Sequence, residues 1–378
     1  MKELKIVIIC LFSLQFCISC QNGKIIDNED NIYPDSTMKV KYAQGFSVDY
    51  FPDYKRVRIF NPWQKGEILN TYYLVNQKEI VTPDKVNTLV VPLQSLGVTS
   101  CTHLEFLNMI GATNCITGIC SPELVYSPLV KSRYQAKKIV NLGDAFNVNM
   151  ECLLALHPEA LMLASYNQQD ENTKRLISSG IPLIYNNEWT ESTILARAEW
   201  LKLVATFFNQ EQLADSLFNN IEFQYLEALQ IAQKLKYRPT IVLGGNFKGT
   251  WYMPGGKSYM AQLFADAGCD YYYKNDTNTG SLPLNFEMVL SQFAQADYWL
   301  NAPVATIEEL FAMDERHQLF KAAKNRKVFG FFARTNENAN DFWESAIAYP
   351  DKVLKDVIWA ISPDLMQDYK PLYIKKLE

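Results

Sequence analysis

The sequence predicts an α/β protein with two lobes joined by a long helix, and three observations support this. Its 378 residues are enough for two domains with substantial cores. Short apolar runs alternate with helical patterns in the first half and again in the second, which is typical of mainly parallel sheets. Between the halves, apolar residues from Ile194 to Phe208 recur at helical spacing without strand signals.

The N-terminus is typical of a processed signal. Lys2 and Lys5 supply positive charge, and the apolar run Ile6–Phe16 is shorter than the roughly 20 residues that span a bilayer. Ser19 and Cys20 follow and resemble a bacterial lipobox, in which the cysteine becomes the acylated first residue. We therefore expect a lipoprotein signal peptide at 1–19 and a membrane anchor at Cys20. An ordinary signal with an incidental cysteine is the alternative.

Elements are expected along the rest of the chain as follows. The Asn/Asp-rich stretch to residue 38 predicts a flexible tether from Cys20 onward. A first lobe is expected over 39–191, a connecting helix over 192–208 and a second lobe over 209–378. Strands are predicted at 46–51, 56–60, 71–75, 88–91, 160–163, 182–185, 240–243, 298–300 and 327–330. Helices are predicted at 103–110, ending at Gly111, and at 174–179.

Composition narrows the function. The chain is 48% hydrophobic and 20% charged, as in soluble globular proteins, and its formal net charge of −5 argues against nucleic acid as a partner. Five cysteines remain after Cys20, an odd number without a CxxC pair: Cys101, Cys115, Cys120, Cys152 and Cys269. Cys115 and Cys120 would suit a disulfide or a thiolate site, but the set is more typical of small buried residues.

Catalytic signatures fail when they are tested. Gly255-Gly256-Lys257-Ser258 resembles the end of a P-loop, but Trp251 stands where the motif needs its first glycine. The chain has neither HExxH nor GxSxG, and its three histidines are far apart in sequence. One of them, His103, remains a candidate axial ligand to a haem or corrinoid metal. We therefore expect a protein that is not an enzyme and has no cofactor or metal site of its own.

A short internal repeat supports two lobes of the same kind. Asn149-Met150-Glu151-Cys152-Leu153-Leu154 and Asn285-Phe286-Glu287-Met288-Val289-Leu290 match in pattern. In each, the asparagine can cap a helix and the glutamate lies in the first turn, where the helix dipole favours negative charge.

Four longer motifs stand out: Leu142-Gly143-Asp144 through Leu156-His157-Pro158-Glu159, Phe320–Val328, Trp251–Tyr259 and Asp341-Phe342-Trp343-Glu344. They resemble motifs of the helical-backbone metal-receptor family, the binding proteins for ferric siderophores, haem and vitamin B12. The last two motifs resemble a Bacteroidetes lipoprotein branch associated with iron compounds. His157 and Glu159 depart from the usual lysine and aspartate of the family.

The resemblance implies a class III periplasmic binding protein, with two Rossmann-like lobes joined by a backbone helix. Such a protein is the monomeric substrate-binding component of an ABC importer. Anchored by lipid in the periplasm, it would capture an iron chelate, a ferric siderophore or haem, and deliver it to the permease and ATPase subunits. A cobalamin- or corrinoid-binding protein is the alternative within the family. The resemblance also implies that Glu151 and Glu287 dock on the permease.

By the same resemblance, the ligand would lie between the lobes, against residues of both halves. The candidates are Trp63, His103, Trp189, Trp251, Tyr252, Gly255, Gly256, Ser258, Tyr259, Arg334 and Trp343. Aromatic faces suit a macrocycle or catechol, Arg334 would pair with a carboxylate or catecholate, and the Pro254-Gly255-Gly256 turn would let backbone amides approach the ligand.

Two other classes of function fit less well. A chelatase-like enzyme on a related frame would need histidines and carboxylates that converge in the cleft, and the three scattered histidines do not provide them. A glycan-binding surface lipoprotein would be expected to have a helical repeat fold, which the alternating strands contradict.

Overall fold

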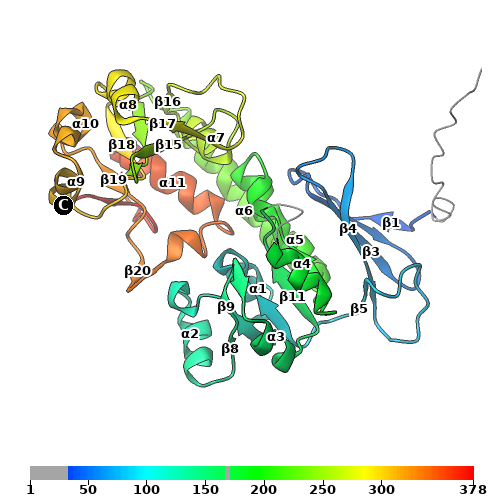
Figure 1. Cartoon of the computed structure of the whole chain (residues 1–378). Coiled ribbons are helices and arrows are strands. Elements are labelled where there is room, and N and C mark those ends of the chain that lie inside the picture. Colours follow the sequence, from blue (N-terminus) through cyan, green and yellow to red (C-terminus); the bar gives the residue numbers. More distant parts are fainter. Residues whose placement is uncertain (1–32, 167–170) are drawn as a thin grey trace, which may run out of the picture. The chain divides into compact units, whose positions relative to one another are not determined.

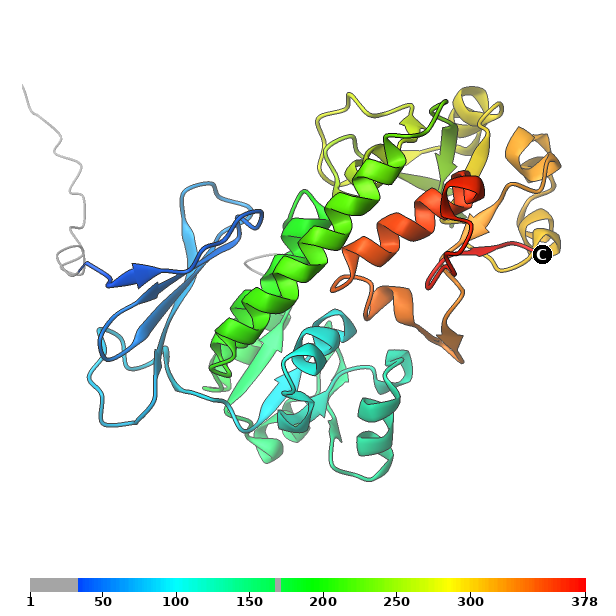
Figure 2. The ribbon, with the colours of Figure 1, turned by 180° about the vertical axis from the view of Figure 1, so that it is seen from behind.

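The computed structural model describes residues 33–166 and 171–378, and Pro34–Glu378 form one compact unit (Figures 1 and 2). The signal peptide, Cys20 and the tether up to residue 32 lie outside the described residues. The end of the predicted tether is not free, because Ser36–Thr37 form strand β1, which pairs with β2.

An N-terminal sheet of five strands comes first, in the order β1-β2-β3-β4-β5. Its remaining strands are β2 (Phe46–Tyr50), β3 (Lys55–Phe60), β4 (Ile68–Val75) and β5 (Thr88–Val90). On β3, Val57 and Ile59 are fully buried, while Arg56 and Arg58 on the other face bind Asp49. This period-2 alternation gives the sheet one apolar face.

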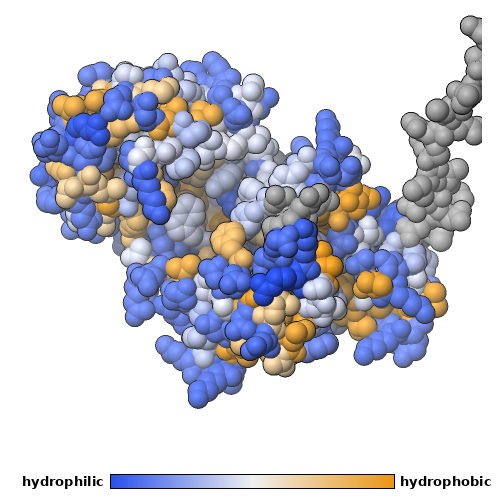
Figure 3. Space-filling model, in the orientation of Figure 1, coloured by the Kyte–Doolittle hydropathy of each residue, from blue (hydrophilic) through white to orange (hydrophobic). Residues whose placement is uncertain are grey.

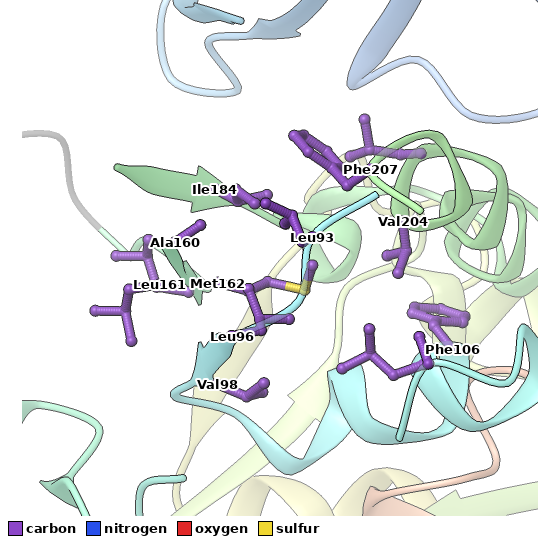
Figure 4. Close-up of a cluster of buried hydrophobic side chains, with 14 of the residues drawn as sticks. Leu93, Leu96, Val98, Phe106, Ala160, Leu161, Met162, Ile184, Val204 and Phe207 are labelled. Carbon is purple, nitrogen blue, oxygen red and sulfur yellow. The ribbon is translucent and has the colours of Figure 1, made fainter. Parts of the chain in front are cut away.

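The first lobe is an all-parallel sheet in the order β12-β11-β6-β7-β8. Its strands are β6 (Leu96–Val98), β7 (Ile116–Ile119), β8 (Val140–Asn141), β11 (Ala160–Leu163) and β12 (Leu183–Tyr185). Its helices are α1 (Leu104–Met109), α2 (Pro128–Gln135), α3 (Met150–Leu156) and α4 (Glu171–Ser178), and a small hairpin joins β9 (Gly143–Asp144) to β10 (Asn147–Val148). Figure 4 shows buried residues of this core, including Met162 of β11, Phe106 of α1 and Phe207 beyond α5.

Two consecutive helices follow, α5 (Ile194–Thr206) and α6 (Glu211–Ala232). Nearly every side chain of α5 is buried, because elements of several parts of the chain pack around it. The N-terminal sheet contributes to that packing, since the ring centroids of Phe46 on β2 and Trp200 on α5 lie 5.2 Å apart. Helix α5 therefore occupies the predicted connecting segment, and α6 extends the helical region well beyond it.

The second lobe has a parallel sheet in the order β16-β13-β18 and an antiparallel sheet in the order β14-β15-β17. The parallel strands are β13 (Thr240–Leu243), β16 (Asp270–Tyr271) and β18 (Tyr298–Leu300), and the antiparallel ones are β14 (Asn246–Phe247), β15 (Thr250–Pro254) and β17 (Ser281–Leu284). Short pairs join β19 (Phe329–Gly330) to β22 (Lys375–Lys376) and β20 (Thr335–Asn336) to β21 (Ala339–Asn340). The helices are α7 (Tyr259–Asp266), α8 (Phe286–Phe293), α9 (Ile307–Met313), α10 (Lys321–Lys324) and α11 (Pro350–Ile361). Helix α11 packs alongside α6, as both ribbon views show.

The α/β class is confirmed, and so is a parallel sheet in each lobe, although the second lobe also contains an antiparallel sheet of three strands. Predicted strands 160–163, 240–243 and 298–300 coincide with β11, β13 and β18. The strand predicted at 88–91 exists, but it pairs with β4 in the N-terminal sheet and does not enter the first lobe's sheet.

Among the described residues, no helix is both long and apolar enough to cross a membrane. The five cysteines after Cys20 are free thiols, so Cys115 and Cys120 form no disulfide.

Candidate functional site

A cavity of about 580 Å³ opens where three parallel strands end. Trp189 lies just beyond β12, Gly244 just beyond β13 and Asn301 just beyond β18. Ligands of open α/β sheets bind beyond the carboxyl ends of their strands, where the loops diverge. The cavity therefore has the position expected of a ligand site shared by the two lobes. Figure 3 shows that the surface is also hollowed between the part covering the first lobe and the part covering the second.

Aromatic side chains from three parts of the chain line this cavity. Trp63 comes from the loop between β3 and β4, Trp189 from the first lobe, and Tyr252 and Tyr259 from β15 and α7 of the second. The exposed fractions of Trp63 and Tyr252 are 39% and 52%, so their rings are available to a ligand. Five of the predicted ligand residues therefore meet at one cavity: Trp63, Trp189, Tyr252, Ser258 and Tyr259.

A buried ion pair supports the cavity wall from behind. The guanidinium of Arg197 on α5 stacks 4.1 Å from the centroid of the Tyr259 ring, and its Nε donates to Glu188 Oε2 at 2.7 Å. Glu188 is fully buried, and desolvation raises the pKa of its carboxyl although the neighbouring arginine opposes this. Arg197 thus links first-lobe Glu188 to second-lobe Tyr259. Sequence reasoning missed this pair, because a glutamate and an arginine nine residues apart carry no distinctive signal.

The polar side chains of the cavity wall are mostly neutral. Glu191 is the one carboxylate among the described lining residues, and its Oε1 already accepts hydrogen bonds from the backbone N–H groups of Gln44 and Gly45 and from the indole of Trp200, each at 2.9 Å. None of the lining residues that the structure describes is a lysine, arginine or histidine. The wall therefore offers aromatic faces and neutral hydrogen-bonding groups rather than charge. Nowhere among residues 33–166 and 171–378 do three or more His, Cys, Asp or Glu side chains gather as metal ligands would.

Trp251 corrects one expectation, because it is a core residue. Its side chain is completely buried, and its indole N–H donates to the Leu243 carbonyl oxygen at 2.8 Å. The ring packs against Trp299, Phe286, Phe320 and His317. A ligand in the cavity cannot touch it without opening the second-lobe core.

The Gly255-Gly256 turn also has a different role from the one predicted. Its amides bind the protein itself: Gly255 N donates to the Gly280 oxygen at 2.8 Å and Lys257 N to the Asn278 oxygen at 3.0 Å. A Cβ atom on Gly255 would lie 2.4 Å from the Asn278 oxygen, so the glycine is needed for this close backbone approach. Ser258 caps α7 by accepting from Ala261 N, and its own hydroxyl donates to the Gly255 oxygen. The turn shapes the cavity wall, and its amides are not free for a ligand.

His103 is likewise enclosed. Its ring has no solvent exposure, and burial lowers the pKa of the imidazole to about 3, so it is neutral. It lines none of the three cavities between the lobes, so the prediction that His103 contacts the ligand is wrong.

Arg334 and Trp343 lie at two other hollows between the lobes. Arg334 pairs with Asp341 at 2.6 Å and lines a cavity of about 330 Å³ with Glu105, Glu344 and Tyr126. Trp343 lines a narrow space of about 50 Å³ that also includes Arg197 and one side of Tyr259. The eleven predicted ligand residues are therefore not one site, and Arg334 is engaged by an internal carboxylate.

Residues 341–349 form a second connection between the lobes. Phe342 and Ala346 belong to the second-lobe core, whereas Ala348 belongs to the first-lobe core. Within this segment the buried carboxylate of Glu344 accepts hydrogen bonds from the backbone N–H groups of Tyr126 and Ser127, which precede α2 of the first lobe. The Tyr349 hydroxyl donates to Glu105 of α1 at 2.8 Å.

Glu344 should make stability depend on pH. Burial, reinforced by Asp341 and Glu105, raises the pKa of its carboxyl from 4.5 to about 7 despite the two N–H donors. Between these values the folded protein holds a proton that the unfolded chain has released. Its free energy of unfolding therefore falls as pH rises, by up to about 3 kcal/mol in total, and this contribution levels off above pH 7. We expect Glu344→Gln to flatten that slope in denaturant titrations at pH 5, 6, 7 and 8. An unchanged slope in the variant would contradict this assignment.

The two glutamates of the repeat occupy matching places. Asn149 caps α3 through Cys152 N and Asn285 caps α8 through Met288 N, so both predicted caps are confirmed. Glu151 and Glu287 are exposed in the first turns of these helices. Glu287 pairs with Arg316 at 2.9 Å, whereas the ion pairs found among the described residues include none with Glu151.

Comparisons with known proteins agree with this architecture. Residues 98–334 match the sequence model of the periplasmic binding protein family. A periplasmic binding protein from Veillonella parvula superposes with a TM-score of 0.57 at 15% identity, over 90% of this chain and 100% of that one. A periplasmic heme-binding protein from Pseudomonas aeruginosa superposes with a TM-score of 0.55 at 14% identity, over 76% of this chain and 98% of that one. An uncharacterised lipoprotein of Methanocaldococcus jannaschii is 23% identical over 99% of this chain and 96% of its own length.

Proposed function

Because the chain belongs to the periplasmic binding protein family, we propose that it is the solute-binding component of an ABC importer that captures an iron chelate, either a ferric siderophore or haem. The observation that carries this proposal is the aromatic cavity at the carboxyl ends of β12, β13 and β18. Such a cavity buries the apolar rim of a chelate, and each fully buried ring contributes roughly 1.5–3 kcal/mol of hydrophobic stabilisation.

The charge of the cavity wall indicates which groups of the chelate would face it. The described lining has no cation to neutralise an inward-facing carboxylate, and burying an unpaired charge is costly. A chelate would therefore present its rings or neutral groups to the wall and keep its anionic groups toward solvent. A corrinoid such as cobalamin, with its neutral amide side chains, satisfies the same condition and is the second candidate.

The same lining speaks against a chelatase-like enzyme. Such an enzyme needs titratable groups near the metal. Glu191 instead accepts hydrogen bonds from three donors of the protein, and His103 is fully buried in the core. A solute-binding role requires only shape, aromatic contact and two lobes that a permease can recognise.

We further propose that Cys20 anchors the protein by lipid to a membrane facing the periplasm. Its relatives in Methanocaldococcus jannaschii include two lipoproteins, and several acyl chains provide stable anchoring. We expect a fatty-acid probe to label the wild-type protein in cells and to leave Cys20→Ala unlabelled. Equal labelling of both proteins would rule out acylation at this cysteine.

Native mass spectrometry of the protein from Gln21 onward tests the main proposal. Haem, ferric enterobactin, ferrichrome and dicyanocobinamide would be offered together at equal concentration. Retention of an iron chelate supports the first candidate, and retention of the cobinamide alone supports the corrinoid alternative. Retention of none of the four would overturn the chelate assignment.

A further inference from the structure

Three aromatic rings form a row of contacts on the first lobe. The Tyr166 ring stacks on Trp189 with centroids 5.3 Å apart, and the Phe146 ring, tilted by 37° to the Tyr166 ring, has its centroid 5.0 Å from that of Tyr166. Phe146 comes from the turn between β9 and β10, Tyr166 follows β11 and Trp189 follows β12. The row therefore collects one ring from each of three separate loops of the first lobe.

The outer rings of this row are not core residues. Phe146 is 66% exposed and Tyr166 is 50% exposed, and neither packs into the hydrophobic core of either lobe. Large apolar rings that face water at neighbouring positions are a common mark of a binding surface. Since Trp189 belongs both to the row and to the cavity wall, the row continues the cavity outward.

Buried polar contacts hold the row in place. Asn187, which is 1% exposed, accepts from the backbone N–H of Ser165 at 2.8 Å and from its hydroxyl at 3.1 Å. This fixes the Tyr166 loop against the Trp189 loop. The hairpin that carries Phe146 is tied to α4, because the Asn172 side chain accepts from Val148 N and donates to the Ala145 oxygen. The rings are thus positioned before any ligand arrives, which lowers the entropy cost of binding.

We propose that Phe146, Tyr166 and Trp189 form an aromatic platform that extends the ligand site beyond the cavity and receives a planar conjugated ring system of the ligand. This inference rests on the proposed function and narrows it to chelates that carry such a ring, because a ring of this kind can pack over the exposed edges of the three rings in edge-to-face contact. Chelates without one would use the cavity alone.

The test compares four variants with wild type, using equilibrium quenching of tryptophan fluorescence with four probes. Haem, dicyanocobinamide and ferric enterobactin carry conjugated rings, and ferrichrome carries none. In the double variant Phe146→Ser/Tyr166→Ser, we expect affinity for the ring-bearing probe that wild type binds best to fall about tenfold or more. Phe223→Ser, which removes a 57% exposed ring on α6, should stay within twofold of wild type, and Tyr166→Phe, which keeps the ring, should lose much less affinity than the double variant. Phe146→Ser alone should give a smaller loss than the double variant.

The outcomes separate the two proposals. If the double variant folds normally by circular dichroism and binds within twofold of wild type, the platform is wrong and the chelate-binding function stands. The platform is also wrong, and the function again stands, if wild type binds ferrichrome and none of the ring-bearing probes. If wild type binds none of the four, both the platform and the proposed function fall.

Discussion

Replacing Trp251 by alanine is expected to lower the free energy of unfolding by about 3–5 kcal/mol, the range for removing a large buried aromatic side chain. The ring is completely buried among four other rings of the second lobe. Its loss also leaves the Leu243 carbonyl oxygen without the indole donor. Guanidinium titration followed by circular dichroism measures this change without relying on tryptophan fluorescence.

The neighbouring Tyr252→Ala and the α7 variant Tyr259→Ala should behave in the opposite way. Tyr252 is half exposed and Tyr259 is partly exposed at the cavity, so we expect affinity for the bound chelate to fall by roughly 1–3 kcal/mol. The loss of stability should be small for Tyr252→Ala. For Tyr259→Ala it should be somewhat larger, since Arg197 loses its stacking partner.

This contrast is informative because Trp251 and Tyr252 are adjacent on one strand. A Trp251→Ala variant that stays as stable as wild type but binds the chelate weakly would place that indole in the ligand site and contradict its position in the core. A Tyr252→Ala variant that binds normally would instead remove β15 from the wall.

The same pair shows what local sequence can and cannot reveal. Alternation along β15 predicts that Trp251 and Met253 share one face and Tyr252 the other. It does not say which face is covered, because that depends on Trp299 and Phe320, which are distant in sequence. The partners of the Gly255-Gly256 turn are hidden for the same reason, since the loop around Asn278 and Gly280 approaches only in the folded chain.

Three strands of the first lobe's sheet, β6, β7 and β8, escaped prediction, and for the first two there is a physical reason. β6 and β7 carry glycines at Gly97 and Gly118, which weaken the strand signal in the sequence. In the structure a Cβ atom on Gly97 would lie 2.7 Å from Leu161, and one on Gly118 would lie 2.7 Å from Leu142. Leucine side chains therefore pack directly over both glycines. By contrast, β11 and β13 consist almost entirely of apolar residues and were predicted at their full lengths.

Removing Glu151 and Glu287 together is expected to cut stimulation of the cognate permease's ATPase about tenfold at low salt while leaving chelate affinity unchanged. Both carboxylates are exposed in the first turn of a helix, where free backbone N–H groups and the dipole stabilise negative charge. Two such charges, one on each lobe, would steer and orient the protein on a permease surface of complementary positive charge. The measurement is ATPase activity of the reconstituted permease with loaded binding protein, repeated over a series of salt concentrations.

The structure adds an asymmetry to this prediction. Arg316 already pairs with Glu287, and its guanidinium also binds Asp314 and stacks over Phe286 at 4.0 Å. Part of the Glu287 charge is therefore neutralised within the lobe, although an exposed pair of this kind contributes only about 0–1 kcal/mol. We expect Glu151→Ala to reduce stimulation more than Glu287→Ala, and charge reversal to lysine to reduce it more than alanine at either position.

Glu227→Ala supplies the matched control, because it removes an exposed glutamate from α6, away from both helix ends. This variant should stimulate the permease as wild type does. The difference between wild type and the double variant should shrink as salt rises, since exposed charges are screened over about 8 Å at physiological ionic strength. Normal stimulation by the double alanine variant at low salt would mean that Glu151 and Glu287 only stabilise the first turns of α3 and α8, and that another surface makes contact with the permease.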